Sequence, residues 1–317
     1  MAPTRVSAVV GVDVGGSGLR LQWTYAGRPG AVVSAPGARI GSREIDVTSL
    51  AADAARLLRE GDVTDVAAVC WSQRGLLFLS DPREVVRVVS SSLGAGRTAV
   101  VSDAVASLVG AVGGVRPGAV VAAGTGAVAF ASDFGSADTS VWRLVDGWGH
   151  VLGDRGSAAW VGLLGLKAGL RHHDGLPGGS ERLLSAGVSA FGATSHWPRR
   201  VMTGGDAPEL LASFAPAVVA VAELGDEVAA RICREAGEAL AESLLSAAAG
   251  IPSPTLVATG GLLGAAPVRS ALEAGLAAAG ASLTPSSGGA LDGALHLAGL
   301  LAQTGTIPRH PAYVHLA

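Results

Sequence analysis

The sequence predicts an α/β fold built from two related halves. Short, β-branched apolar runs bounded by glycine are typical of buried strands, and along the chain they alternate with stretches of helical period. The combination of strand, glycine turn and strand occurs twice, at 7–25 and at 118–132. Because each half repeats this order, we expect two α/β domains whose glycine turns point toward one another.

A domain boundary is expected near 103–117, where glycine and proline cluster before the second glycine turn. The length of 317 residues suits two domains. We divide the chain into an N-terminal domain, 1–112, a C-terminal domain, 113–302, and a tail, 303–317.

The elements follow from local patterns. Residues 47–60 have a helical period that ends near Gly61, and 226–249 repeats apolar residues at steps of four. The segment 98–114 is expected to form a strand, then Asp103, then a helix closed by glycines. The other expected strands are 7–14, 19–27, 66–72, two within 118–132, 255–261 and 281–284. The other expected helices are one that follows the loop 146–157 and ends at about 170, and two over 265–279 and 289–302.

Composition excludes several classes of function. Hydrophobic residues make up 49% and charged residues 15% of the chain, enough for a large core. The net charge of −3, without a basic block, argues against nucleic acid or an anionic membrane as partner. The first apolar run is too short for a signal peptide, and no run of 18 strongly apolar residues occurs. We expect a soluble cytoplasmic protein.

The two cysteines predict no metal centre. Cys70 and Cys233 each lie in an apolar stretch and lack the spacing of metal ligands. We expect buried, reduced thiols.

The first glycine turn could bind phosphate. Gly15, Gly16 and Gly18 have no Cβ, so their amides can approach a ligand closely, and Ser17 adds a hydroxyl. Asp13 would repel phosphate but could hold Mg²⁺ through water. A glycine-rich hairpin without any ligand explains this turn equally well.

The second glycine turn repeats this chemistry with Gly124, Thr125 and Gly126. A simple hairpin turn would explain it alone, but two such turns at strand junctions favour phosphate binding. A Walker loop is excluded, because the single lysine, Lys167, has no Ser or Thr after it.

Five motifs occur in the order seen in N-acetylglucosamine kinases, and the chain resembles that family, within the BadF/BadG/BcrA/BcrD-type ATPases and the actin/hexokinase/Hsp70 superfamily. The resemblance spans about 10 to 300, and the loop GWGHVLGDRGS is its most specific part. The motifs are 13–17 (DVGGS), 102–104 (SDA), 124–126 (GTG), 147–157 and 259–261 (TGG).

The resemblance implies two RNase-H-like domains around an interdomain cleft that holds ATP and Mg²⁺. Homodimers are frequent among relatives, so it also implies a homodimer. The implied nucleotide residues are Gly15, Gly16, Ser17, Gly124, Thr125, Gly126, Gly225, Gly260 and Gly261, with Asp13 near the metal.

The same resemblance implies a sugar site beside the γ-phosphate, with Asp103 as the catalytic base. A helix N-cap is the alternative for Asp103, and a turn-forming role is the alternative for Asp154. Trp148 could also be a core residue, and Ser72 a strand-end turn. The implied sugar-binding residues are Ser72, Asp103, Trp148, Gly149, Asp154 and Ala158.

Three departures from the family pattern concern the identity of the sugar. The region 35–42 lacks an asparagine, the loop after 66–72 reads Ser-Gln-Arg-Gly, and an arginine follows Asp154. We hypothesise that Arg39, Arg74 or Arg155 faces the pocket and favours a sugar with a carboxylate, such as N-acetylmuramate.

We therefore expect an ATP-dependent kinase that phosphorylates an amino sugar, most simply O6 of N-acetylglucosamine. The alternatives are a kinase for another amino sugar, such as glucosamine or N-acetylmuramate, and a sugar or nucleotide sensor without catalysis. An ATPase that activates an iron–sulfur enzyme would need cysteine ligands that this chain does not offer.

Overall fold

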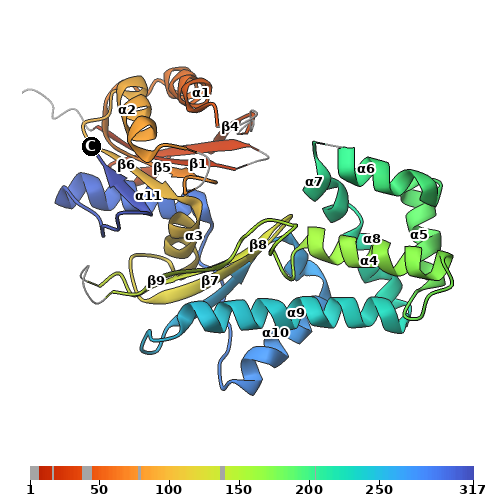
Figure 1. Ribbon diagram of the computed structural model, residues 1–317. Helices are drawn as coiled ribbons and strands as arrows, with labels where there is room; N and C mark the ends of the chain where they lie inside the picture. Colours follow the sequence, from red (N-terminus) through yellow and green to blue (C-terminus); the bar gives the residue numbers. More distant parts are fainter. Residues whose placement is uncertain (1–6, 16–17, 38–44, 78–79, 136–139, 204) are drawn as a thin grey trace, which may run out of the picture.

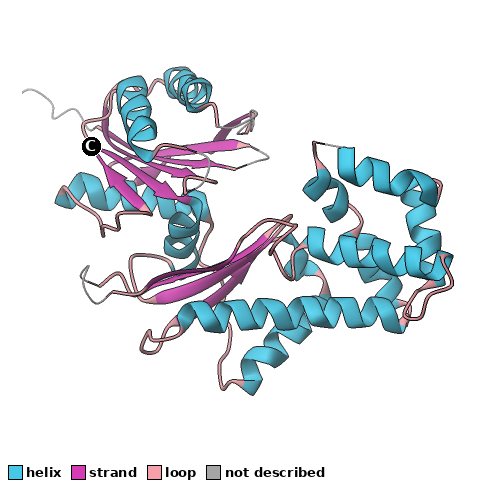
Figure 2. Cartoon of the chain, in the orientation of Figure 1, coloured by secondary structure: helices cyan, strands magenta, loops and turns pink. Residues whose placement is uncertain are grey.

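The computed structural model describes residues 7–15, 18–37, 45–77, 80–135, 140–203 and 205–317. Two mixed β-sheets lie in separate layers, with helices between them and on their outer faces (Figures 1 and 2). The predicted α/β class is confirmed.

The first sheet has its parallel strands at its centre. Strand β1 pairs antiparallel with β2 and parallel with β5, and β5 pairs parallel with β6. The sheet order is β11-β6-β5-β1-β2-β3, with β4 also on β2. Its strands are β1 (Ala8–Val14), β2 (Leu19–Tyr25), β3 (Arg28–Pro29), β4 (Val33–Ala35), β5 (Val66–Gln73), β6 (Thr98–Ser102) and β11 (Val314–Leu316).

Helices cover both faces of this sheet, as Figure 1 shows. Helices α1 (Val47–Glu60) and α2 (Pro82–Leu93) pack on one face. Helices α3 (Asp103–Val112) and α11 (Ala290–Thr304) pack on the other. Helix α1 has the predicted limits because Asp46 caps its start and the chain leaves it at Gly61.

The second sheet has the order β10-β7-β8-β9. The long helix α9 (Glu227–Ala248) covers one face, with α10 (Ala266–Ala278) packed on it. The other face meets α3, since Val120, Phe130 and Val257 join the core around that helix. Its strands are β7 (Gly118–Ala123), β8 (Ala127–Ser132), β9 (Trp142–Asp146) and β10 (Thr255–Thr259).

A helical subdomain lies beside the second sheet (Figure 1). Its centre holds Leu183, Trp197, Leu211 and Phe214, all buried. Of its helices, the sequence patterns predict only the first. Its elements are α4 (Ala158–His173), α5 (Glu181–Phe191), η1 (Thr194–His196), α6 (Trp197–Thr203), α7 (Ala207–Ala212) and α8 (Ala215–Glu223), while η2 (Gly261–Gly264) follows β10.

Among the described residues, no single helix is long and apolar enough to cross a membrane. One pair, Ala207–Glu223 with Glu227–Ala248, meets that criterion jointly but is bent by 119°.

The expected strand at 281–284 is wrong. No strand is formed by this segment, although the Thr284 amide donates to the Leu256 carbonyl of β10 at 2.7 Å. The Ala281 amide instead donates back to Leu276, and Pro285 has no amide hydrogen to continue a ladder.

The C-terminal part of the chain returns to the first sheet. Helix α11 packs against α3 and β1, and β11 pairs antiparallel with β6. This packing places α11 with the first half of the molecule rather than the second. The domain limits at 112 and 302 stay predictions.

Helices α3 and α11 cross at very short range. A Cβ on Gly293 would lie 1.9 Å from the Ala106 carbonyl oxygen, and one on Gly110 would lie 1.9 Å from that of Gly289. Gly11 of β1 is also crowded, since a Cβ there would lie 2.6 Å from the Leu295 amide nitrogen. Because these neighbours are backbone atoms, they cannot move aside cheaply.

We expect Gly293→Ala to destabilise the fold by at least about 1–3 kcal/mol, because it overpacks this crossing. Gly299→Ala, in the same helix, is the matched control, since no atom lies within 4 Å of its added Cβ. The control should be neutral or stabilising by up to about 1 kcal/mol. Urea unfolding measures both variants, and equal stability would contradict the close crossing.

Candidate active site

The carboxyl ends of three parallel strands bring candidate residues to one edge of the first sheet. Asp13 on β1 is in register with Ser72 on β5, and Gln73 is in register with Ser102 on β6. Arg74 directly follows β5, with its amide bonded to the Val14 carbonyl at 3.0 Å. Asp103 directly follows β6. Such an edge is where ligands bind in α/β sheets.

Asp13 is 6% exposed and both of its carboxylate oxygens accept hydrogen bonds. Arg20 Nη2 donates to Oδ2 at 2.5 Å, and the buried Ser72 hydroxyl donates to Oδ1 at 3.3 Å. Ser72 therefore orients Asp13. The predicted contact of Ser72 with a sugar stays a prediction. The sequence analysis missed Arg20, although the register of the first hairpin, which pairs it with Asp13, could have revealed it.

The Asp13 site suits Mg²⁺ only through water and phosphate. The described residues contain no group of three or more His, Cys, Asp or Glu side chains that could hold a metal. The Arg20 side chain is 56% exposed, so it can move to solvent and free one oxygen of Asp13. Magnesium commonly uses one or two carboxylates and keeps several waters, which this donor set can satisfy.

Asp103 is the first residue of α3 and not its N-cap. Ser102 caps the helix, with Oγ accepting from the Val105 amide at 3.4 Å. The Asp103 carboxylate accepts from the Ala104 amide at 3.0 Å. Burial raises the pKa of Asp103 to about 6, with Arg74 opposing this rise and the negative charge of Asp13 adding to it. The carboxyl is thus a proton acceptor poised near neutral pH.

We expect Asp103→Asn to stabilise the fold at neutral pH. With the folded pKa raised from 3.8 to about 6, stability is greatest below the unfolded pKa and falls as pH rises through 6. At about 1.4 kcal/mol per pH unit, the ionised carboxyl costs roughly 2–3 kcal/mol at pH 7.5.

Asparagine removes this cost. Urea unfolding should therefore show a more stable variant at pH 7.5 and little difference at pH 4. An advantage that is equal at both pH values would refute ionisation as its cause.

Each glycine turn has a backbone hydrogen bond between glycines at its ends. The Gly15 amide donates to the carbonyl of Gly18, three residues on, at 2.9 Å, and the Gly124 amide to that of Gly126, two residues on, at 2.9 Å. Gly16 and Ser17 lie outside the described residues.

Asp154 joins the second glycine turn to the loop 147–157. Its Oδ1 accepts from the Gly149 amide at 3.1 Å, and a Cβ on Gly126 would lie 2.6 Å from its Oδ2. Burial raises the pKa of Asp154. The positive charge of Arg74 favours the ionised form of both Asp154 and Asp103, and so opposes the rise in the pKa of each. Acids from both halves of the chain therefore lie within the electrostatic range of one arginine.

Asp146, at the end of β9, holds the loop in shape, and the sequence analysis missed it. It accepts from the amides of Asp154 at 2.6 Å and Arg155 at 2.9 Å. Both Asp146 and Asp154 have positive φ, +61° and +55°, which aspartate tolerates better than most residues. The signal for Asp146 in the sequence was its place in an Asp-Gly pair directly before a glycine-rich loop.

The start of α4 supports the second glycine turn. The Ala158 amide donates to the Gly124 carbonyl at 2.9 Å, and the Ala159 amide to that of Thr125 at 3.1 Å. The Ala158 amide is therefore engaged in the turn. Its predicted sugar contact remains a prediction.

Trp148 and the arginines proposed to face the pocket differ in their exposure and their partners. Trp148 is 62% exposed, so the alternative of a core tryptophan is wrong. Arg155 pairs with Glu242 on α9 at 3.1 Å, whereas the charge of Arg74 acts on both Asp103 and Asp154. Arg39 lies outside the described residues.

The glycines expected near adenosine differ in what the protein requires of them. Gly260 has φ of +111°, and a Cβ there would lie 2.2 Å from the Ala123 carbonyl oxygen, so packing alone demands glycine. Gly261 and Gly124 have ordinary φ and no atom within 4 Å of an added Cβ. Packing does not explain these two glycines, and close approach of a ligand would.

The Gly225 amide donates to the Ala222 carbonyl of α8 at 2.9 Å, not to this group. It connects α8 to α9 with φ of +84°, a conformation that itself favours glycine. The neighbouring Asp226 caps α9 and accepts from the Ser180 hydroxyl at 2.7 Å. The nucleotide contact of Gly225 stays a prediction.

Two sheets that share the helices between them, with acids at the strand ends facing glycine turns, define the actin/hexokinase-type class of proteins. The BadF/BadG/BcrA/BcrD ATPase family model matches residues 79–295. The chain belongs to this family, which confirms the resemblance seen in the sequence.

Similar proteins carry sugar-kinase names. An N-acetylmuramic acid/N-acetylglucosamine kinase of Clostridium acetobutylicum is 28% identical over 180 residues, which cover 56% of this chain and 56% of that protein. The match thus spans about half the length of this curated relative.

Solved structures resemble nearly the whole chain. A proposed N-acetylglucosamine kinase of Chromobacterium violaceum is 25% identical, with a TM-score of 0.71 over 94% of this chain and 99% of that one. Another from Porphyromonas gingivalis, at 16% identity, has a TM-score of 0.69 over 94% of this chain and 100% of that one, and supports the fold.

Proposed function

We propose that this protein is an ATP-dependent amino-sugar kinase that transfers the γ-phosphoryl group to a sugar hydroxyl. One observation carries the proposal: Arg74 acts electrostatically both on Asp103, whose pKa burial raises to about 6, and on Asp154, which lies beside the second glycine turn. We infer that a proton acceptor, a polar loop and a glycine turn belong to one site.

In this mechanism Asp103 accepts the proton of the attacking hydroxyl as its oxygen bonds to phosphorus. A base with a pKa near 6 is ionised at neutral pH and is still basic enough to help the transfer. Closure of the two halves would exclude water and limit hydrolysis of ATP.

The glycine turns would hold the phosphates, with Gly15, Gly16 and Ser17 on one side and Gly124, Thr125 and Gly126 on the other. Gly260, Gly261 and Gly225 would border the adenosine. The open positions at Gly124 and Gly261 support this assignment. Asp13 would hold Mg²⁺ through water, and the metal would neutralise phosphate charge.

The sugar would lie against Asp154, Gly149, Trp148 and Ala158, with Ser72 acting through Asp13. N-acetylglucosamine with transfer to O6 is the first candidate, supported by the names of the relatives. We further propose a cytoplasmic homodimer, with the location supported by the apolar patterns of the sequence and the homodimer by the family resemblance alone.

We expect ADP release to depend on an amino sugar, and Asp103→Asn to lower kcat by about 10²–10⁴-fold with nucleotide affinity unchanged. Loss of the base removes proton transfer but no phosphate contact. Asp53→Asn, on the exposed face of α1 where it pairs with Arg56, is the matched control. Coupled ADP assays over a panel of sugars measure turnover, and full activity of Asp103→Asn would reject this base.

A second candidate substrate is an amino sugar with a carboxylate, because the Arg74 guanidinium acts electrostatically on both Asp103 and Asp154. An arginine can bind a carboxylate through two parallel hydrogen bonds. A sugar such as N-acetylmuramate would present that group.

For this candidate, Arg74→Ala should lower kcat/KM for the acidic sugar by about 10-fold or more relative to the neutral one. Arg155→Ala is the control, since Arg155 pairs with Glu242. If the ratio stays the same in both variants, Arg74 does not select the sugar.

Two other functions receive less support. A sensor without catalysis would not need the shifted pKa of Asp103, and sugar-dependent ADP release separates it from a kinase. An activator of an iron–sulfur enzyme would need cysteines that can bind a cluster, but Cys70 and Cys233 lie buried in different cores. Burial also raises the pKa of both thiols, that of Cys233 to about 11, which disfavours the thiolate that a cluster needs.

A further inference from the structure

The C-terminal segment touches the residue next to the proposed base. The Ser102 amide donates to the Tyr313 carbonyl at 3.0 Å, and the following β11 pairs with β6 from Val314 opposite Val101 to Leu316 opposite Ala99. On its other side β6 pairs with β5, with Gln73 opposite Ser102. The end of β6, and Asp103 after it, is therefore held from both sides.

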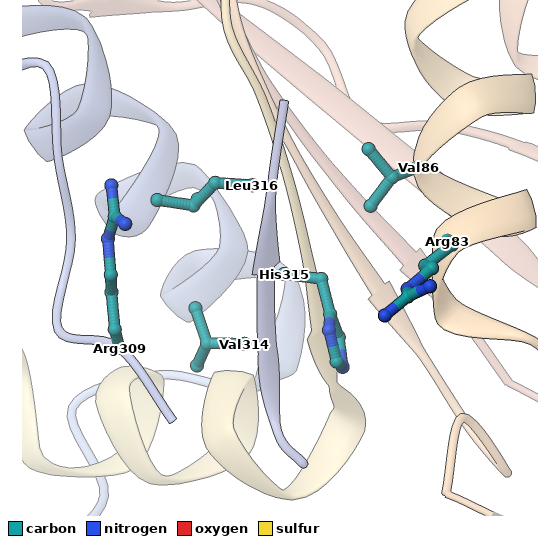
Figure 3. A pocket seen from close by; sticks show the side chains of 6 residues that line it. All are labelled: Arg83, Val86, Arg309, Val314, His315 and Leu316. Atoms are coloured by element: carbon teal, nitrogen blue, oxygen red, sulfur yellow. The ribbon is translucent and has the colours of Figure 1, made fainter. Parts of the chain in front are cut away.

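Strand β11 is the edge of its sheet, so β6 is its one strand neighbour among the described residues. Figure 3 shows His315 pointing toward α2 and Arg83, with Val314 and Leu316 on the other side. A groove of about 440 Å³ borders the strand and is lined by Arg83, Val86, Arg309, Val314, His315 and Leu316. The C-terminal segment has a further anchor outside this sheet.

That anchor is a cluster of rings on the second sheet. The Tyr313 ring lies edge-on to Phe130 of β8, with centroids 5.2 Å apart, and is stacked on Trp142 of β9 at 6.2 Å and 11°. His310 lies 5.2 Å from Trp142 and 4.6 Å from Tyr313. Edge-on and offset ring pairs are favourable beyond their buried area. Tyr313 thereby connects the second sheet to the end of β6.

We propose that Tyr313 is a positioning residue for Asp103, holding the Ser102 amide with its carbonyl while its ring fixes that carbonyl against the second sheet. Its effect on turnover rests on the proposed kinase function. Its two contacts reach opposite halves of the molecule, so Tyr313 sets the place of the base relative to the second glycine turn. Small displacements of a catalytic group lower turnover strongly.

The test compares Tyr313→Ala with Tyr313→Phe in the full chain. The alanine variant loses the ring and is expected to lower kcat on the order of tenfold, with KM for ATP within about twofold. Phenylalanine keeps the ring and should behave as the original protein. Phe134→Ala is the matched control, because Phe134 contacts Trp142 at 5.3 Å in the same cluster and belongs to neither β6 nor the C-terminal segment.

Hydrogen exchange gives a readout that does not depend on activity. The Ser102 amide should lose protection in Tyr313→Ala and keep it in Phe134→Ala. If Tyr313→Ala does not fold, Tyr313→Leu replaces it with the same expectations.

Unchanged kcat and unchanged Ser102 protection in the Tyr313 variant would overturn the proposal, as would equal losses in both alanine variants. An original protein that shows no sugar-dependent ADP release would instead overturn the kinase function. Exchange at Ser102 would then still decide whether Tyr313 holds the end of β6.

Discussion

The close crossing of α3 and α11 is the constraint on which the rest of the structure depends. Each helix presents a glycine to the backbone of the other, and a methyl group at either position would lie 1.9 Å from a carbonyl oxygen. The two helices together fill the space between the sheets. Because α3 begins with Asp103, the same crossing that joins the halves also fixes the direction from which the proposed base faces the site.

The site is electrostatically unbalanced until a ligand arrives. Asp13 adds negative charge beside Asp103, Asp146 does the same for Asp154, and burial raises the pKa of both Asp103 and Asp154. Arg20 and Arg74 offset part of this charge. A metal-bound nucleotide and a hydroxyl that gives up its proton would both interact favourably with these negative charges. The excess of buried acids lowers the stability of the fold, and the proposed function explains why it is kept.

The sequence also explains why some roles are ambiguous before the fold is known. Asp103 is preceded by Ser102, and either residue could cap α3 by type. The structure shows that Ser102 does so, which leaves the Asp103 carboxyl for other chemistry. Arg74 and Arg155 are equivalent candidates from their places in the family pattern, yet a surface pair with Glu242 sets Arg155 apart.

By itself the sequence determined the α/β class, the two strand-turn-strand units and helix α1, because periodicity and turn residues are local signals. Asp103 and Asp154 became the chief candidates through the resemblance of their motifs to a known family. Only the tertiary structure decided that Arg20 meets Asp13, that Ser72 turns toward Asp13, that 281–284 forms no strand, and that the tail pairs with β6. The reason is physical. These features depend on partners that are distant along the chain, and a local pattern carries no information about which strand edge is free to pair with a given segment.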